Sequence, residues 1–129
     1  MKILLIDIDG TITTDDIRNE DSHLYPHANP IPESIDQINK WYSEGNHITF
    51  FTAREEKDRQ VTIDWLDKSG FRYHGLIMGK PRCLNPDDEY IWIDNRKVRA
   101  VTYKSIWGDF EVVNKDILTT SKSPQMNLS

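Results

Sequence analysis

The stretch from Lys2 to Thr11 reads KILLIDIDGT, and it predicts the type of fold. A run of isoleucine and leucine opens the stretch, Asp7 and Asp9 interrupt it, and Gly10 ends it. A short apolar run bounded by glycine is typical of a buried strand in a parallel sheet. We therefore expect a first strand at residues 2–8, with two acidic side chains near its carboxyl end.

The rest of the chain alternates between helical and strand patterns. Apolar residues recur at helical spacing after Pro32 and again over residues 58–69, and Gly45 and Gly70 stand where glycine commonly ends a helix. Further strands are expected at residues 47–51, 76–78, 90–93 and 110–113, and a further helix at residues 95–103. Strands that alternate with helices predict a single α/β domain of the Rossmann-like type, a three-layer α/β/α arrangement around a mainly parallel sheet.

The length of 129 residues fits one domain, since domains usually hold roughly 100–150 residues. We assign residues 1–118 to this core, residues 13–30 to a polar flap within it, and residues 119–129 to a flexible polar tail. The single cysteine, Cys83, cannot form an internal disulfide, which favours a reducing, cytoplasmic location.

The charge of the chain bears on its partners. It has 21 acidic and 16 basic side chains and a formal net charge of -5. Such a protein has no general attraction for nucleic acid or for anionic membranes. No segment reaches the roughly 18 apolar residues of a membrane helix. We therefore expect a small-molecule partner and no membrane, and nucleic acid is the less favoured partner.

Polar residues follow each expected strand. Asp7 and Asp9 end the first, Thr52 follows the second, Lys80 the third and Asp94 the fourth. In parallel α/β folds, ligands bind beyond the carboxyl ends of the strands, so these side chains are expected to line one pocket. Crowded carboxylates favour a cation, and oxygen ligands of this kind suit Mg²⁺. A hydroxyl and an ammonium group can bind a phosphoryl group, so the set predicts Mg²⁺-dependent phosphoryl chemistry.

The segment DIDGT adds a reactive pair to this pocket. One aspartate can attack phosphorus, while the other gives a proton to the leaving oxygen and later activates water. Gly10 allows a sharp turn and lets backbone amides approach a phosphate.

Four segments of the chain resemble the four motifs of the haloacid dehalogenase-like (HAD) phosphatase superfamily. DIDGT resembles motif one, FFTAR at residues 50–54 motif two, MGKPR at residues 78–82 motif three, and YIWIDN at residues 90–95 motif four. They occur in the family's order and extend over most of residues 1–103. The resemblance implies an enzyme that hydrolyses phosphomonoesters through an aspartyl-phosphate intermediate.

The resemblance also implies a role for each matched residue. Asp7 is then the nucleophile and a metal ligand, and Asp9 is the general acid and base, with its main-chain carbonyl as a second metal ligand. Thr52 binds phosphate through its hydroxyl, Lys80 offsets the phosphoryl charge, and Asp94 completes the Mg²⁺ site. The residues implied to contact the substrate are Gly10, Thr11, Ala53, Arg54 and Arg82.

Two features depart from the family pattern. Motif four often has a second acid where this chain has Asn95, whose amide oxygen can bind metal without charge, so we expect weaker Mg²⁺ affinity. The intervals between the motifs are too short for a cap domain, so the chain resembles a capless member, of a kind that often closes its site by forming homo-oligomers. The flap then remains as the candidate for substrate contacts, through Arg18, His23, Tyr25 and His27.

The resemblance leaves the substrate open. A small phosphomonoester such as a sugar phosphate is favoured. The alternative is a 3′-phosphorylated nucleic acid end, because TARE, TIDWLDKSG, IDNRKVRAV and WGDF are similar to the phosphatase domain of polynucleotide kinases. A basic run could then follow a strand's phosphates, formed by Arg96, Lys97, Arg99 and Lys104. A receiver-like or non-catalytic phosphate-binding domain is least favoured, because DIDGT supplies both a nucleophile and an acid.

Overall fold

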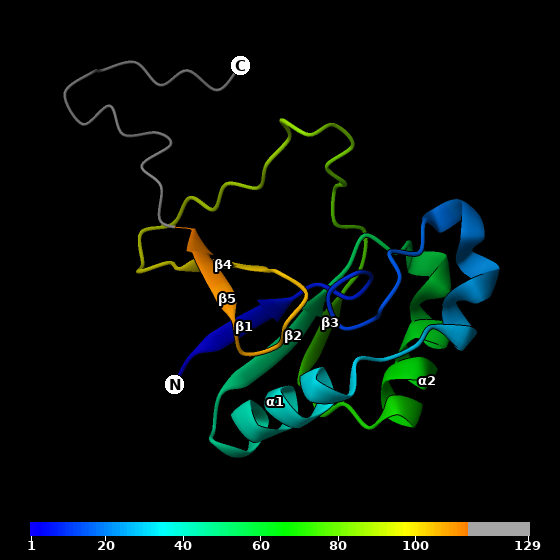
Figure 1. The fold of residues 1–129 in the computed structure, drawn as a ribbon, viewed down its shortest axis with the longest axis horizontal. Coiled ribbons are helices and arrows are strands. Elements are labelled where there is room, and N and C mark those ends of the chain that lie inside the picture. The colour runs from blue at the N-terminus through cyan, green and yellow to red at the C-terminus, as the bar shows by residue number, and fades with distance from the viewer. Residues whose placement is uncertain (114–129) are drawn as a thin grey trace. The chain divides into compact units, whose positions relative to one another are not determined.

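The computed structural model of this chain describes residues 1–113. The chain divides into two compact units, of which the first is Met1–Tyr90 and the second begins at Ile91. The first unit contains a parallel sheet and the two α-helices, and the second contains a β-hairpin (Figure 1). The predicted end of the core at residue 118 and the predicted tail at residues 119–129 lie outside the described residues.

The parallel sheet of the first unit consists of β1 (Ile3–Ile6), β2 (His47–Phe51) and β3 (Gly75–Ile77), in the order β1-β2-β3. Ile6 pairs with Phe50, and Phe50 pairs in turn with Leu76. All three strands therefore end at the same edge of the sheet. The predicted α/β class with a parallel, Rossmann-like sheet is confirmed.

The two α-helices lie close to where the sequence predicts them. Helix α1 (Pro32–Ser43) has proline in its first turn, where the missing amide hydrogen costs no helical bond. Helix α2 (Arg59–Ser69) ends at Gly70, whose φ of 91° is the left-handed conformation that glycine adopts without strain. No helix in residues 1–113 is long and apolar enough to cross a membrane.

The flap at residues 13–30 contains η1 (Asn19–His27), a 3-10 helical segment that the sequence pattern did not predict. A β-bridge between Thr13 and Pro30 closes the base of the flap. The C-terminal part of the flap, close to this bridge, contacts α2, because the indole N–H of Trp65 donates a 2.9 Å hydrogen bond to the carbonyl of Ala28. Figure 1 shows η1 lying beside α2, and the short η2 (Glu56–Asp58) leads into that helix.

An apolar core supports the loop that follows β1. Ile8, Ile12, Ile38, Ile48 and Leu66 are completely buried. Phe50 of β2 also has no exposed surface and meets Phe71 edge-on, with 5.6 Å between the ring centroids. Two of these isoleucines flank Asp9 and Gly10, so the loop that carries the acidic residues is anchored on both sides by core side chains.

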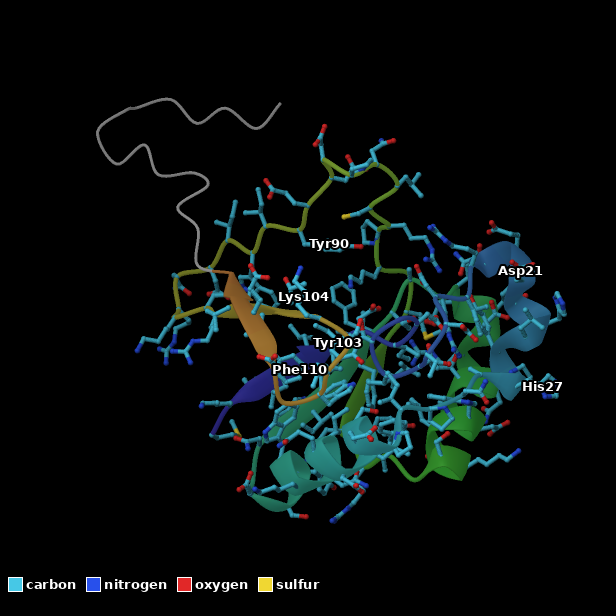
Figure 2. The ribbon with its side chains drawn as sticks, in the orientation of Figure 1. Asp21, His27, Tyr90, Tyr103, Lys104 and Phe110 are labelled. Atoms are coloured by element: carbon cyan, nitrogen blue, oxygen red, sulfur yellow. The ribbon has the colours of Figure 1, made fainter. Side chains whose placement is uncertain are left out.

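The second unit contains an antiparallel hairpin of β4 (Ala100–Tyr103) and β5 (Phe110–Val113). Tyr103, Trp107 and Phe110 form an aromatic cluster in this hairpin, and the Trp107 and Phe110 ring centroids lie 5.1 Å apart. Figure 2 labels Tyr103 and Phe110 on its two strands. The predicted strand at residues 110–113 is confirmed, although its partner is antiparallel.

Two predicted elements in this part of the chain are wrong. Residues 90–93 are not a strand, and residues 95–103 are not helical but end in β4. The β-branched residues Val101 and Thr102 favour a strand once Val112 and Glu111 are available as partners across the hairpin. The YIWI segment has the composition of a strand, but a strand forms only where a neighbouring strand takes up its backbone hydrogen bonds.

Candidate active site

The loop after β1 turns tightly around one carbonyl group. The carbonyl of Ile8 accepts hydrogen bonds from the amides of residues 11, 12 and 13 at 3.1, 2.9 and 3.3 Å. Gly10 has a φ of 80°, and a Cβ added there would lie 3.3 Å from the Cβ of Asp16. The loop therefore requires glycine at this position. The amide of Gly10 donates to Asp15 O and Thr13 Oγ1, so in this structure it serves the loop itself.

Asp7 lies at the start of this loop, directly after β1. Its Oδ2 accepts a 3.1 Å hydrogen bond from Thr11 Oγ1, and its Oδ1 lies 3.8 Å from Lys80 Nζ. The Asp7 side chain is 36% exposed, so one side of the carboxylate is open. Burial raises the pKa of Asp7, while the Lys80 ammonium and the Thr11 hydroxyl act in the opposite direction.

Backbone hydrogen bonds join the segments that carry Thr52 and Lys80. The amide of Thr52 donates to Ile77 O at 2.9 Å, and the amide of Lys80 donates to Thr52 O at 2.9 Å. Thr52 is 1% exposed, and its Oγ1 accepts a 3.2 Å hydrogen bond from the amide of Arg54. Because that bond uses a lone pair of the oxygen, the hydroxyl can still donate its proton to a ligand.

Tyr90 is a neighbour of Lys80 that the sequence reasoning missed as a site residue. The Lys80 ammonium lies 4.4 Å from the centroid of the Tyr90 ring, a cation–π contact, and the Tyr90 hydroxyl donates to Pro81 O. Figure 2 labels this side chain. The sequence offers only one signal for it, because Tyr90 is the first residue of the YIWIDN segment, and that segment predicts a strand.

Asp9 lies in quite different surroundings, because both of its carboxylate oxygens face Arg54. Arg54 Nε donates to Oδ2 at 2.9 Å and Nη2 donates to Oδ1 at 2.8 Å, which is a two-pronged ion pair. The Arg54 side chain has no exposed surface and that of Asp9 is 5% exposed. The predicted contact of Arg54 with substrate stays a prediction, and in this structure its guanidinium faces protein groups.

Arg82 is held far more loosely. Its Nη2 donates to Ile17 O at 3.4 Å, and its Nη1 lies 3.8 Å from Asp16 Oδ1. Its Nε is buried without a hydrogen-bond partner among the described residues. Unlike Arg54, this arginine retains capacity to bind an anion.

The flap residues considered from the sequence fall into two groups. Arg18 and His27 line a cavity of about 310 Å³ together with Asp16 and Asp21. Asp21 and His27 are labelled on η1 in Figure 2. His23 is exposed and lies outside the residues that line the cavity, whereas Tyr25 is completely buried against Arg54. Ala53, another predicted contact, accepts a 3.2 Å hydrogen bond at its carbonyl from the side chain of Asn19.

The metal ligands expected from the sequence divide between the two units. In the first, Asp7 fits an oxygen-ligand role because its carboxylate is partly open, while Asp9 can offer only its main-chain carbonyl as long as Arg54 holds its side chain. In the second, Asp94 accepts hydrogen bonds from Trp92 Nε1 and from the amide of Arg96, which lower the pKa of Asp94. Residues 1–113 contain no group of three or more His, Cys, Asp or Glu side chains placed to hold a metal ion. The Mg²⁺ set of Asp7, Asp9, Asp94 and Asn95 therefore stays a prediction.

Two solved structures align with this fold. A structure from Vibrio cholerae aligns with 28% identity and a TM-score of 0.54, over 76% of this chain and 83% of that one. The D,D-heptose 1,7-bisphosphate phosphatase from B. bronchiseptica, solved with magnesium and phosphate, aligns with 19% identity and a TM-score of 0.46, over 68% of this chain and 53% of that one. No curated protein matches the chain.

The parallel sheet and the acidic loop after its first strand are those of a HAD-like phosphatase fold. Residues 4–106 match the model of the LNS2 domain of PITM 1-3. The chain belongs to this LNS2 domain family. The matched range contains all of the residues predicted for the site.

Proposed function

We propose that this protein is a Mg²⁺-dependent phosphatase that hydrolyses a small phosphomonoester through an aspartyl-phosphate intermediate. The observation that carries the proposal is the placement of Asp7. Its carboxylate follows β1, is open on one side, and lies 3.8 Å from the Lys80 ammonium. A nucleophile beside a cation is the arrangement that attack on a charged phosphoryl group requires.

Substrate binding would use the groups that retain hydrogen-bonding capacity. The Thr52 hydroxyl and the Lys80 ammonium would bind the oxygens of the phosphate, and Arg82 is the nearest loosely held cation in the segment after Lys80. Mg²⁺, when bound by Asp7, the Asp9 carbonyl, Asp94 and Asn95, would supply charge neutralisation and orientation of the phosphate.

The reaction then proceeds in two steps. An oxygen of Asp7 forms a bond to phosphorus as the bond to the leaving oxygen breaks, and Asp9 gives its proton to that oxygen. In the second step Asp9 takes a proton from water, whose oxygen attacks the aspartyl phosphate. Inorganic phosphate leaves, and the Asp7 carboxylate and the protonated Asp9 are restored.

The short intervals between the motifs support a small substrate or one that covers the site itself. The intervals between the four motifs hold no cap domain, so we propose a capless enzyme whose flap lies next to the catalytic loop. The flap adjoins the acidic loop, because Asp15 O accepts a 3.2 Å hydrogen bond from the amide of Gly10 and Asp16 Oδ1 lies 3.8 Å from Arg82 Nη1. Its cavity is lined by groups of both charges, which suits a polar leaving group such as a sugar.

The test is phosphate release from a panel of sugar phosphates, nucleotides and a 3′-phosphorylated oligonucleotide, with and without Mg²⁺. We expect Mg²⁺-dependent turnover of a small ester at a rate that changes little with salt, and none in an Asp7→Asn variant. Turnover of the oligonucleotide alone, with a steep fall at high salt, would favour the nucleic-acid alternative. Wild-type protein that releases phosphate from none of these compounds would overturn the proposal.

A further inference from the structure

Arg54 is the largest completely buried side chain of the described residues, and each part of its guanidinium meets a specific partner. Two nitrogens bind Asp9, as described above, and Nη1 donates a 3.1 Å hydrogen bond to Thr62 Oγ1. The Cζ atom lies 3.8 Å from the centroid of the Tyr25 ring. A cation with these contacts is fixed in position and has no surface left for a substrate.

The two-pronged bond fixes the orientation of Asp9. A planar guanidinium that binds both oxygens of a carboxylate allows little rotation of that carboxylate about its own bond. Each carboxylate oxygen has a further lone pair, so Asp9 can still exchange a proton with another group while Arg54 holds it. The two-pronged bond suits the carboxylate that takes a proton from water in the second step. In the first step, when one oxygen carries the proton, Arg54 would bind the other oxygen and keep the carboxyl group in the same orientation.

The flap holds Arg54 in turn. The hydroxyl of Tyr25 donates a 2.9 Å hydrogen bond to Asn19 Oδ1, and Asn19 Nδ2 donates to the carbonyl of Ala53, the residue before Arg54. Tyr25 has no exposed surface, so its ring contact with Arg54 is desolvated. The flap is thus joined to the Asp9–Arg54 pair through both a side chain and the backbone.

We propose that Arg54 is a positioning residue that orients Asp9 toward the leaving oxygen, and that the flap keeps Arg54 in place through Tyr25 and Asn19. This inference rests on the proposed phosphatase function and specifies how its general acid is held. It assigns Arg54 an action through Asp9, in place of the direct substrate contact that the sequence suggested.

The test uses two substrates that differ in their need for an acid. The leaving group of glycerol phosphate is an alkoxide, which needs a proton as it departs. The leaving group of 4-nitrophenyl phosphate is a stable phenolate, which needs little help from an acid. If Arg54 orients Asp9, Arg54→Met should lower kcat/KM on glycerol phosphate by about 10²-fold, with a much smaller loss on 4-nitrophenyl phosphate. The two substrates are compared by kcat/KM because it reports the step in which the leaving oxygen departs, whereas kcat also contains hydrolysis of the aspartyl phosphate, which uses Asp9 for both substrates. Arg54→Lys should restore little of this loss, because an ammonium group cannot form the two-pronged bond.

A matched control is available in Arg72, which also lies over a tyrosine and bonds a hydroxyl. Its Cζ is 4.3 Å from the Tyr42 ring centroid and its Nη1 donates to Ser43 Oγ, but no carboxylate of residues 1–113 pairs with it. Arg72→Met should leave the ratio of the two kcat/KM values unchanged.

The double variant Asp9→Asn/Arg54→Met keeps the test available if Arg54→Met does not fold, since it removes both buried charges together. If Arg54 acts through Asp9, the double variant should lose no more activity on glycerol phosphate than Asp9→Asn does. A further loss in the double variant, or an equal loss of kcat/KM on both substrates in Arg54→Met, would overturn the inference.

These outcomes are distinct from failure of the proposed function. A wild-type protein that hydrolyses neither ester nor any other member of the panel would overturn the phosphatase proposal and this inference with it. If the wild type is active and the Arg54 variants lose kcat/KM equally on both substrates, only the inference about Arg54 is overturned.

Discussion

Asp7 and Asp9 are separated by one residue, yet their surroundings differ in exposure, in partner and in connection to the rest of the fold. The Asp7 carboxylate is partly open to solvent, with one hydroxyl and a more distant ammonium group as neighbours. The Asp9 carboxylate is buried in a two-pronged ion pair beneath the flap.

This contrast indicates that two acids one residue apart can have different physical roles. A nucleophile must reach the substrate, so it needs an open side and weak partners. A proton donor must face one atom of the substrate, so it benefits from rigid partners. The variants below test this contrast, in order of decreasing expected effect.

The largest effect is expected for Asp7→Asn, because an amide cannot attack phosphorus. We expect kcat for phosphate release to fall by about 10³-fold or more. We also expect no loss of folding stability, because burial raises the pKa of Asp7 and so makes its charged form unfavourable in the fold.

The difference in stability between the wild type and Asp7→Asn should depend on pH. The folded-state pKa lies above the ordinary value of 3.8, so ionised Asp7 opposes folding once the pH exceeds that raised pKa. The stability advantage of Asn at position 7 should therefore be present at neutral pH and vanish below 3.8. Urea unfolding of both proteins at neutral and acid pH measures it, and a destabilised variant at neutral pH would contradict the expectation.

The next largest effect is expected for Asp9→Asn, now on stability. The substitution leaves the buried Arg54 guanidinium without its counter-charge, and breaking a buried pair typically costs about 3 kcal/mol or more. Urea unfolding should show this loss. If Asp9→Asn and Asp7→Asn were equally stable, the contrast between the two regions would fail.

A smaller effect is expected for Thr62→Val, which keeps the shape of the side chain and removes the hydroxyl. The variant loses two hydrogen bonds, the 3.1 Å bond from Arg54 Nη1 and the 2.8 Å bond that the hydroxyl donates to Asp58 O, which together should lower the free energy of unfolding by about 2 kcal/mol. Gln60→Ala on the same helix removes only an exposed hydrogen bond and serves as the control, with an expected change within about 0.5 kcal/mol. Equal losses in the two variants would show that neither bond of the Thr62 hydroxyl contributes to stability.

The smallest effect is expected for Tyr25→Phe, and it depends on pH. Near neutral pH the lost bond to Asn19 should lower stability by about 1 kcal/mol. Burial, and next the Asp9 charge, raise the pKa of Tyr25 from 10.0 to about 12. The wild type should therefore lose stability as the pH rises through this interval, because the unfolded tyrosine ionises first.

The phenylalanine variant cannot ionise at this position, so the stability advantage of the wild type should shrink between pH 10.0 and about 12 and then change sign. A shift of this size corresponds to more than about 2 kcal/mol, which exceeds the roughly 1 kcal/mol of the lost hydrogen bond. Unfolding measured on either side of this interval provides the comparison. A difference that stays constant with pH would place Tyr25 in more polar surroundings than the structure describes.

The local elements of the first unit could be predicted from sequence because their signals are local. The apolar run before Asp7 forms β1, and Gly70 ends α2 in the left-handed conformation. The rule that parallel strands end at one edge also anticipated that Asp7 and Lys80 would lie close together.

The partner of Asp9 could not be predicted, because Arg54 lies 45 positions away in sequence and tertiary packing alone brings the two together. For the same reason the contacts of Tyr25 and Thr62 with Arg54 could not be predicted, although Tyr25 was a candidate for substrate contact. The hairpin in the second unit was missed because the preference of residues 100–103 for a strand depends on pairing with residues 110–113. Long-range pairing thus limited both the fold and the site predictions.

The contact between Trp65 and Ala28 has a spectroscopic consequence. The indole is 4% exposed, and its N–H donates to a carbonyl at the end of the flap. If the flap leaves α2, water reaches this indole, and its fluorescence emission should shift to longer wavelength and become sensitive to quenching by iodide. Because the chain has four tryptophans, the signal is isolated in a variant that keeps Trp65 and has phenylalanine at positions 41, 92 and 107. Such a variant would report flap position during substrate binding without any attached label.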